Sequence, residues 1–590
     1  MIAHAALAGL LLALATPADT TDWTTDFERS GGTRTPRYAE TIAYCQRLAD
    51  ASPWVRFTRF GASARGRDLP LLVVAREGAF DPDAARAAGN AVVLVQAGIH
   101  AGEIDGKDAG LMLVRDIVIT RTREALLDHV TLLFIPIFNV DGHERFGPHN
   151  RINQNGPEEM GWRVTAQNLN LNRDYLKADT PEMRAWLRLF DAWQPDLFVD
   201  CHVTDGADYQ YAVTYALETF GSMDPALTEW TRERFGAPLE SAMAADGIPI
   251  QRYGSFRVGH EPRSGLDCWV APPRLSQGYT AIRNRPGLLI ETHMLKDYAT
   301  RVAGTYTMLR HTLAIAGVEH ERLRAAVVAA DARTASSAFR AQPFPIDFRA
   351  GPDSVMIDFL GVAYDVIDSD LTGGKWHRYD GRPVTWRIPY FHTQVPKTTV
   401  RLPEAYVIPP EWTEVIDRLW LHGVHLARTT RERTMEVDSY RFEDARWRND
   451  PYEGRHPVTL RAEPVRERRL IPSGSVVVDM NQPAARVAAH ILEPAGPDSY
   501  VYWGFFDAVF EVKEYVESYV IEAMAREMLA DSALARAFEE QKRADPAFAA
   551  DTGAIRRWFY RRTPYWDDRV GVYPVGRIAA RADVEALLGP

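Results

Sequence analysis

Short apolar runs alternate with segments of helical spacing over the first 340 residues of the chain. Residues 92–95 are four aliphatic residues in a row, a pattern typical of a strand buried on both faces. Similar runs follow at 131–138, 197–200 and 288–290. Apolar residues recur at helical spacing elsewhere, and we expect helices over 38–51, 107–120, 181–193, 225–246, 297–317 and 319–338. This alternation predicts an α/β fold with a mixed, mostly parallel sheet and helices on both faces.

The pattern changes near residue 340. Composition shifts over 337–352, and from 355 to 480 strand-like segments are separated by Pro and Gly. A segment of helical spacing follows at 509–528. With 590 residues the chain is long enough for more than one core. We therefore expect an α/β domain over 19–340, followed by an α+β C-terminal extension over 341–590.

The N-terminus has the outline of a secretory signal. Residues 2–18 give an apolar run that ends in small residues. No Lys or Arg precedes the run, so a frayed apolar N-terminus is the alternative. We expect a signal peptide over 1–18 and an exported protein, periplasmic or extracellular. No later stretch is long and apolar enough to span a bilayer.

Charge and cysteine content exclude some classes of protein. The formal net charge of -11 argues against nucleic acid as a partner. The three cysteines, Cys45, Cys201 and Cys268, cannot all pair, so this is not a fold held together by disulfides. Ordinary hydrophobic cores must therefore stabilise the chain.

Polar groups that suit a metal follow three of the predicted strands. His100 and Glu103 come just after the first apolar run, His202 follows the third, and Glu291 follows the fourth. Because the carboxyl ends of parallel strands lie along one edge of a sheet, we expect these groups to meet there. Two His and one carboxylate are a typical ligand set for catalytic zinc. We therefore predict one Zn²⁺ per chain on His100, Glu103 and His202, with Glu291 as general base toward water.

Six short motifs in a fixed order carry a resemblance to a known family. They are His-x-x-Glu at 100–103, Asn-x-Asp-Gly at 139–142, Trp162-Arg163, Asn172-Arg173, His202 and Glu291. With this order, residues 35–320 resemble the zinc metallocarboxypeptidases of the carboxypeptidase A type. Past Pro343 the chain resembles extensions found on some bacterial secreted relatives.

The resemblance implies roles for individual residues. Arg163 would stabilise the oxyanion of the tetrahedral intermediate, usually the largest kind of catalytic help. Asn172 and Arg173 would bind the free C-terminal carboxylate of a peptide substrate, which suits the planar fork of a guanidinium. Tyr279 is a candidate for the family's mobile tyrosine, although it lies closer to the catalytic Glu than the family pattern has it. Asn170 stands where the family usually has an Asp that supports the first His.

The leading interpretation is an exported zinc metallocarboxypeptidase that hydrolyses C-terminal peptide bonds through a zinc-activated water. An amidase or deacylase, or a peptidase for cell-wall stem peptides, would present the same carboxylate beside the scissile amide and stays open. An inactive binding module that uses the zinc cleft is a third hypothesis, and the presence of Glu291 and Arg163 speaks against it. No Gly-x-Ser-x-Gly motif occurs, which disfavours a serine hydrolase.

Overall fold

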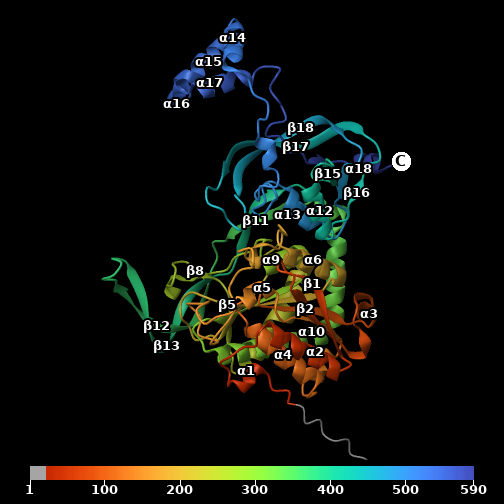
Figure 1. Ribbon diagram of the computed structural model, residues 1–590, viewed down its shortest axis with the longest axis vertical. Helices are drawn as coiled ribbons and strands as arrows, with labels where there is room; N and C mark the ends of the chain where they lie inside the picture. The colour runs from red at the N-terminus through yellow and green to blue at the C-terminus, as the bar shows by residue number, and fades with distance from the viewer. Residues whose placement is uncertain (1–21, 590) are drawn as a thin grey trace, which may run out of the picture.

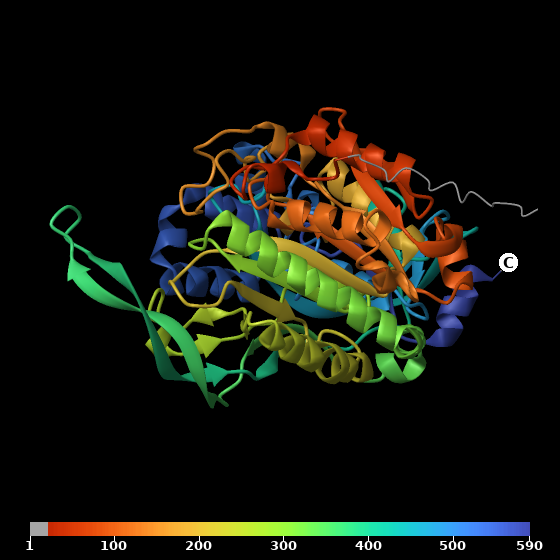
Figure 2. The same cartoon turned by 90° about the horizontal axis from the view of Figure 1, so that it is seen from below.

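The structure is a computed structural model that describes residues 22–589, so the predicted signal peptide at 1–18 lies outside the described residues. An α/β body forms the lower part of the molecule, with a β-rich part above it and a small group of helices at the top (Figure 1). A long two-stranded arm projects from the body (Figure 1 and Figure 2). Within 22–589, no helix is long and apolar enough to cross a membrane.

The body is built on one eight-stranded sheet, which confirms the predicted mixed α/β class. Its central strands β4, β3, β5 and β10 run parallel, whereas β1–β2, β2–β4 and β10–β6 pair antiparallel and β6–β7 pair parallel. In sheet order the strands are β1 (Val55–Ala62), β2 (Asp68–Val74), β4 (Val130–Ile135), β3 (Ala91–Ala97), β5 (Leu197–Thr204), β10 (Gly287–His293), β6 (Val213–Leu217) and β7 (Ile250–Arg252).

Alternate residues of the central strands belong to two separate hydrophobic clusters. Val92 of β3 packs in the cluster that contains α6 (Pro181–Trp193), whereas Val93 packs with α4 (Asp105–Val118) and α10 (Tyr298–Thr334). Successive side chains of a strand point to opposite faces, so both faces of the sheet are covered. Figure 2 shows α10 crossing one of them. The other helices of the body are α1 (Asp26–Arg29), α2 (Tyr38–Ala51), α3 (Pro82–Ala87), α5 (Val140–Glu144), α7 (Pro225–Trp230), α8 (Ala237–Ala245) and α9 (Ser276–Ile282).

One helix replaces two that the sequence predicts. Helices expected at 297–317 and 319–338 are a single α10 of 37 residues, followed by the short α11 (Ser337–Arg340). Gly317 suggests a helix end, but here it serves close packing. A Cβ at this position would lie only 2.8 Å from the carbonyl oxygen of Asp128. The missing side chain therefore lets the helix pass close to this turn without ending.

The C-terminal part contains three further groups of strands. A six-stranded sheet has the order β16 (Ala427–Arg428), β19 (Val476–Asp479), β15 (Ala405–Ile408), β20 (Gly576–Ile578), β17 (Arg433–Trp447) and β18 (Val458–Ile471). The arm is formed by β12 (Val355–Asp368) and β13 (Lys375–Phe391), and β11 (Phe344–Ala350) pairs with β14 (Gln394–Val400). Three helices, α12 (Thr413–Leu421), α13 (Ala485–Leu492) and α18 (Arg581–Leu588), pack beside the six-stranded sheet.

The helix expected at 509–528 is shorter than predicted. Only α14 (Ser518–Met528) is α-helical there. Val512 and Tyr515 are exposed, so the preceding residues bury no apolar face, whereas Ile521 packs against Phe559 and forms a local core. This core holds together α14, α15 (Ser532–Ala544) and α17 (Thr552–Tyr560), and Phe548 of α16 (Pro546–Ala550) packs on Phe538 of α15. These are the helices at the top of Figure 1.

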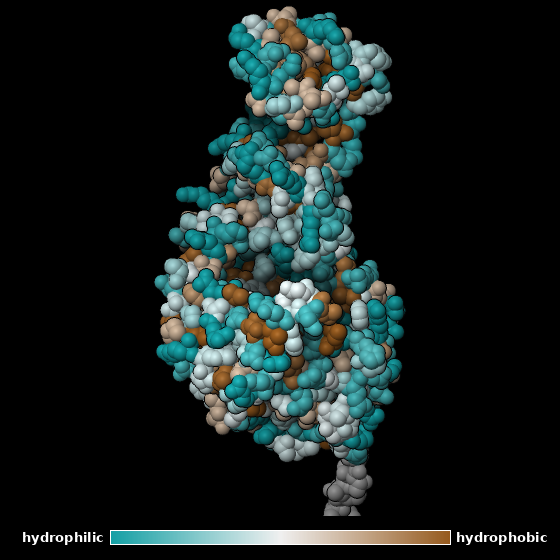
Figure 3. Space-filling view, turned by 90° about the vertical axis from the view of Figure 1, so that its left-hand side faces the viewer, coloured by the Kyte–Doolittle hydropathy of each residue, from teal (hydrophilic) through white to brown (hydrophobic). Residues whose placement is uncertain are grey.

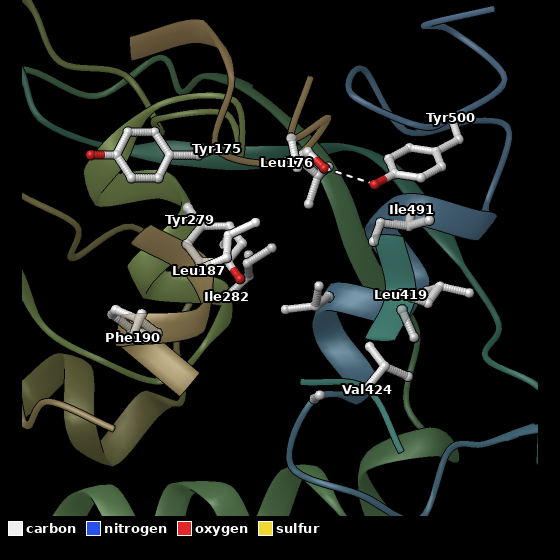
Figure 4. Packing of buried hydrophobic residues seen from close by; sticks show 14 of the residues in the cluster. Tyr175, Leu176, Leu187, Phe190, Tyr279, Ile282, Leu419, Val424, Ile491 and Tyr500 are labelled. Carbon is white, nitrogen blue, oxygen red and sulfur yellow. Dashed lines mark hydrogen bonds between the residues drawn. The ribbon is translucent and has the colours of Figure 1, made fainter. Parts of the chain in front are cut away.

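The body and the C-terminal part share strands and a core across the expected boundary at 340. In the body, β9 (Leu266–Asp267) pairs with the end of β13 and with β8 (Ser255–Phe256). One hydrophobic cluster contains residues of both parts (Figure 4). The hydroxyl of Tyr500 donates to the carbonyl oxygen of Leu176 at 2.9 Å, across this contact. The two parts are therefore packed as one continuous interior.

Candidate active site and metal centre

Three elements bring the predicted metal ligands together at one edge of the sheet. His100 lies in the turn after β3, Glu103 lies just before α4, and His202 lies near the end of β5. All three side chains are buried. Their ligand atoms all lie within 4.8 Å of one another. The structure thus places these three predicted residues in one cluster, which would suit a single ion.

Hydrogen bonds fix which ring nitrogens face the centre of this cluster. The Oδ1 atom of Asn170 accepts the backbone N–H of Asn172 at 2.9 Å, so the oxygen of this side-chain amide is the atom that faces His100. His100 therefore donates from Nε2 to Asn170 at 3.0 Å, and His202 donates from Nε2 to Asp200 at 2.8 Å. Both rings turn Nδ1 toward the centre, as metal-binding histidines held by such partners do.

The centre is rich in lone pairs and attracts positive charge. The two Nδ1 atoms are 3.2 Å apart, and each lies 3.1 Å from Oε2 of Glu103. Burial lowers the pKa of His100 to about 4. Burial opposes the charged form of His202 as well, but the Asp200 carboxylate raises the pKa of His202 well above its ordinary value. Two imidazole nitrogens and a carboxylate oxygen in this arrangement fit a zinc ion.

Glu291 lies beside the cluster without belonging to it. In the parallel pairing of β10 with β5, Glu291 is opposite His202, so both side chains emerge on the same side of the sheet. Burial raises the pKa of Glu291 to about 8, and the nearby carboxylates of Glu103 and Asp200 add to this effect. A carboxyl group with a pKa this close to neutrality can both accept and return a proton.

Two arginines contact the outer oxygen of Glu103. Arg163, which the sequence predicts, lies 3.1 Å from Oε1 of Glu103, and Arg151 lies 2.7 Å from the same atom. Burial would raise the pKa of Glu103, but His100 and Arg151 hold it well below its ordinary value. Glu103 is therefore ionised, with Oε1 turned to the arginines and Oε2 to the histidines.

Asn172 and Arg173 line the same cavity as the metal cluster, which has a volume of about 470 Å³. The Asn172 side chain is held by the backbone N–H of Ser276, which donates to its Oδ1 at 3.3 Å. The Arg173 guanidinium donates to the Asn172 carbonyl oxygen at 2.7 Å and forms no ion pair within residues 22–589. A guanidinium in a cleft without a carboxylate partner is suited to bind one from a ligand.

The structure places the candidate tyrosine away from the cavity. Tyr279 is fully buried in the core, where its hydroxyl lies 2.9 Å from Nδ1 of His422, and it does not line the cavity. Its neighbour on α9, Gln277, does line the cavity. Residues two positions apart on a helix point to nearly opposite sides, so only one of them can face the cleft. The tyrosine in the cavity is Tyr253, and the Glu291 carboxylate raises its pKa well above the usual value, which keeps the hydroxyl protonated.

Three residues of the site are absent from the sequence-based set. Asp200 could have been predicted from its position. It ends the apolar run two residues before His202, and residues two apart on a strand lie on the same face. Arg151 and Tyr253 lie in irregular segments that no periodicity describes. Their approach to Glu103 and Glu291 depends on the course of those loops.

Comparison with known proteins gives a family for the body. Residues 41–233 match the family model described as zinc carboxypeptidase. Carboxypeptidase 2 of Trichophyton rubrum is 24% identical over 516 residues, covering 83% of this chain and 88% of its own. Carboxypeptidase 2 of Trichophyton equinum is 23% identical over 517 residues, with the same coverage of 83% and 88%. These relatives are fungal, and their alignments are longer than the body alone.

Solved structures of carboxypeptidases are also similar to this chain, at lower sequence identity than the fungal relatives. A metallo-carboxypeptidase from Pseudomonas aeruginosa, in complex with (2-guanidinoethylmercapto)succinic acid, is 20% identical with a TM-score of 0.37 and covers 49% of this chain and 70% of its own. Carboxypeptidase A from Helicoverpa armigera is 17% identical with a TM-score of 0.36, covering 50% and 75%. By the family model, residues 41–233 form a zinc carboxypeptidase domain, and the curated relatives that align with most of the chain are carboxypeptidases.

Proposed function

We propose that this protein is a zinc-dependent carboxypeptidase that hydrolyses the peptide bond next to a free C-terminal carboxylate. One observation carries the proposal. The cavity combines a convergent His100–Glu103–His202 cluster and Glu291 with the guanidinium of Arg173, which has no ion-pair partner among the described residues. Residues suited to activate water and a guanidinium suited to bind a carboxylate thus line the same cavity.

His100, Glu103 and His202 would hold one zinc ion per chain. The fit rests on the donor set, because two Nδ1 atoms and a carboxylate oxygen converge while the far side of each ring is held by Asn170 or Asp200. When bound, zinc polarises a carbonyl group and lowers the pKa of water to around neutrality.

Glu291 is the general base and then the general acid of the proposed reaction. It takes a proton from the attacking water as oxygen bonds to the carbonyl carbon of the scissile amide. It then gives that proton to the amide nitrogen, whose bond to carbon breaks. One water is consumed, and a shortened peptide and a free amino acid leave. The buried position of Glu291, with its raised pKa, suits both transfers.

Arg163 and Arg173 would act on different parts of the substrate. Arg163 has an exposed fraction of 42% for its side chain, so it can reach the oxyanion that develops on the scissile carbonyl while staying near Glu103. Asn172 and Arg173 would bind the terminal carboxylate and set the distance from it to the bond that is cut.

The carboxylate-binding pair Asn172 and Arg173 also supports a second candidate activity. An N-acyl amino acid or a cell-wall stem peptide also carries a free carboxylate next to an amide, and Arg173 would bind it in the same way. A substrate panel that varies only the group on the far side of the amide separates an amidase or deacylase from a peptidase. Binding without turnover of any member would favour the inactive module instead.

The metal assignment predicts a specific loss in one variant. In His202→Ala, zinc content after equilibrium dialysis should fall from about one per chain to a small fraction, because one of three protein ligands is gone. Circular dichroism should show the fold retained. Asp200→Asn should weaken zinc binding by about 10- to 100-fold, because it alters the partner that orients His202. The exposed His456 offers a matched control, His456→Ala, which should keep its zinc. Full zinc occupancy in His202→Ala would contradict the assignment.

Export is part of the proposal and rests on the apolar run before Ala18. Protein isolated from its natural host should begin near Thr16 or Asp19 when its N-terminus is sequenced. A mature chain that begins at Met1 or Ile2 would contradict export by cleavage of this segment.

A further inference from the structure

A second cavity opens beside the catalytic one. Its volume is about 540 Å³, and five residues line both cavities. These shared residues are Asn153, Thr204, Asp205, Tyr253 and Met294. The two spaces are therefore two chambers of one continuous cleft, which we call the catalytic chamber and the second chamber. Figure 3 looks onto the side from which the arm projects and shows a surface hollowed below the β-rich part.

The second chamber has an aromatic wall to which the arm contributes. Tyr209, Phe256 and Phe359 line it and pack in one small cluster. Phe359 belongs to β12, whose base is fixed to the body because the side chain of Gln210 donates to the carbonyl oxygen of Gly361 at 2.8 Å. Residues beyond 340 thus form part of the cleft, next to the site of the reaction.

The direction of a bound peptide follows from which residues line which chamber. Asn172, Arg173 and Glu291 line the catalytic chamber only. If the terminal carboxylate of a peptide lies on Arg173 and its scissile carbonyl lies near Glu291, its last residues occupy the catalytic chamber. The chain upstream of the scissile bond then needs further space, and the second chamber is the adjoining one.

The passage between the chambers carries an unbalanced negative charge. Asp205 lines both chambers, is exposed, and forms no ion pair within residues 22–589. The nearest basic residue of the second chamber in sequence, Arg252, is already engaged. It lies 3.3 Å from Glu240 and stacks on the ring of Tyr215. An unpaired carboxylate in a partly enclosed cleft favours a cation at that point.

We propose that the second chamber binds the part of a peptide substrate upstream of the scissile bond, and that Asp205 selects a cationic group there. That group is a Lys or Arg side chain, or the α-ammonium of a short peptide. The inference rests on the proposed carboxypeptidase function and adds a subsite built in part by the C-terminal extension. Contacts along the aromatic wall make longer peptides better substrates than blocked dipeptides.

Filling the second chamber tests its use. Gly259 lines it, and a Cβ there would meet no atom within 4 Å, so Gly259→Trp adds bulk without a clash at the backbone. Ser255→Trp fills it from β8. In the wild type, kcat/KM should rise at least about tenfold from a blocked dipeptide to a blocked pentapeptide with the same last two residues. The two variants should remove this rise and leave the dipeptide unchanged. Gly374→Trp, at the tip of the arm, is the control that should behave as wild type.

Charge variants test the role of Asp205. With N-acetylated pentapeptides that differ only upstream of the scissile bond, Lys should be preferred over Glu by about three- to tenfold in kcat/KM. Asp205→Asn should bring this ratio near one, and Asp205→Lys should reverse it. Asp370→Asn removes an equally exposed charge from the tip of the arm and should leave the ratio unchanged. Comparing free and acetylated tripeptides without Lys or Arg tells whether an α-ammonium is recognised as well.

The outcomes separate this inference from the function on which it rests. If the wild type hydrolyses no peptide with a free C-terminus, the proposed function fails. If it does, but both filling variants keep the length dependence and Asp205→Lys keeps the wild-type preference, the second chamber does not bind substrate and the inference is overturned.

Discussion

Replacing Glu291 by Gln should lower kcat/KM for a free-acid peptide by at least about a hundredfold, with zinc content still near one per chain. The amide keeps the shape of the side chain but cannot take a proton from water. A ligand to the metal would behave differently, because its loss would lower the zinc content as well. Steady-state kinetics and metal analysis on the same preparation distinguish the two cases.

A matched control for this variant is Glu182→Gln. Glu182 is also fully buried and burial also raises its pKa, but it lies on α6 away from the cleft. This control should keep wild-type turnover. Unchanged activity in Glu291→Gln would mean that another group activates the water.

The pH profile of kcat/KM should show the titration of Glu291. A general base must be deprotonated, so activity falls as pH drops through the pKa of Glu291. Burial raises this pKa to about 8, and a cation held beside Glu291 lowers it from there. The acid limb of the zinc-bound enzyme should therefore lie below pH 8, and it should disappear in Glu291→Gln.

Amidating the C-terminus of a good substrate should cost at least about a hundredfold in kcat/KM, on the order of 3 kcal/mol. The amide removes the charge that Arg173 would bind and leaves the guanidinium facing a neutral group in a partly desolvated cleft. Arg173→Ala should cost the free acid a similar factor but cost the amidated peptide little more. Such non-additive losses in a two-by-two comparison indicate that arginine and carboxylate act on each other.

Arg188→Ala controls for the loss of a positive charge. Arg188 is an exposed arginine of α6 that lies outside the catalytic chamber, so its replacement should leave both substrates unaffected. Equal cleavage of free-acid and amidated peptides by the wild type, or cleavage at internal bonds, would rule out an exopeptidase.

The metal cluster could be predicted because its members follow apolar strands. Short runs rich in β-branched residues, such as 92–95, favour buried strands, and parallel strands place their carboxyl ends along one edge. His100, His202 and Glu291 were therefore predictable as neighbours although 191 positions separate the first from the last. The family resemblance then supplied roles for Arg163, Arg173 and their neighbours.

Residues in irregular segments could not be predicted in the same way. Tyr253 and Asp205 reach the cleft through loops that are fixed by later parts of the chain, because β8 after Tyr253 pairs with β9 and Tyr209 after Asp205 bridges to Gly361 of β12. Tyr279 was named from the family resemblance, and α9, with only 7 residues, carries no periodicity that would show which side faces the core. Its hydrogen-bond partner, His422, comes from the C-terminal part.

The contact between the two parts of the chain indicates that the body depends on the C-terminal part for its stability. Leu176, Leu187 and Ile282 of the body pack in the same cluster as Leu419 and Ile491 (Figure 4). Asp179 of the body is also paired, with Arg418 at 3.0 Å and Arg455 at 2.7 Å. Cutting the chain near residue 340 would bring these apolar side chains of the body into water and leave the Asp179 carboxylate without its guanidinium partners. We therefore expect the smallest piece that folds and acts to extend well beyond residues 41–233, the stretch that the family model matches.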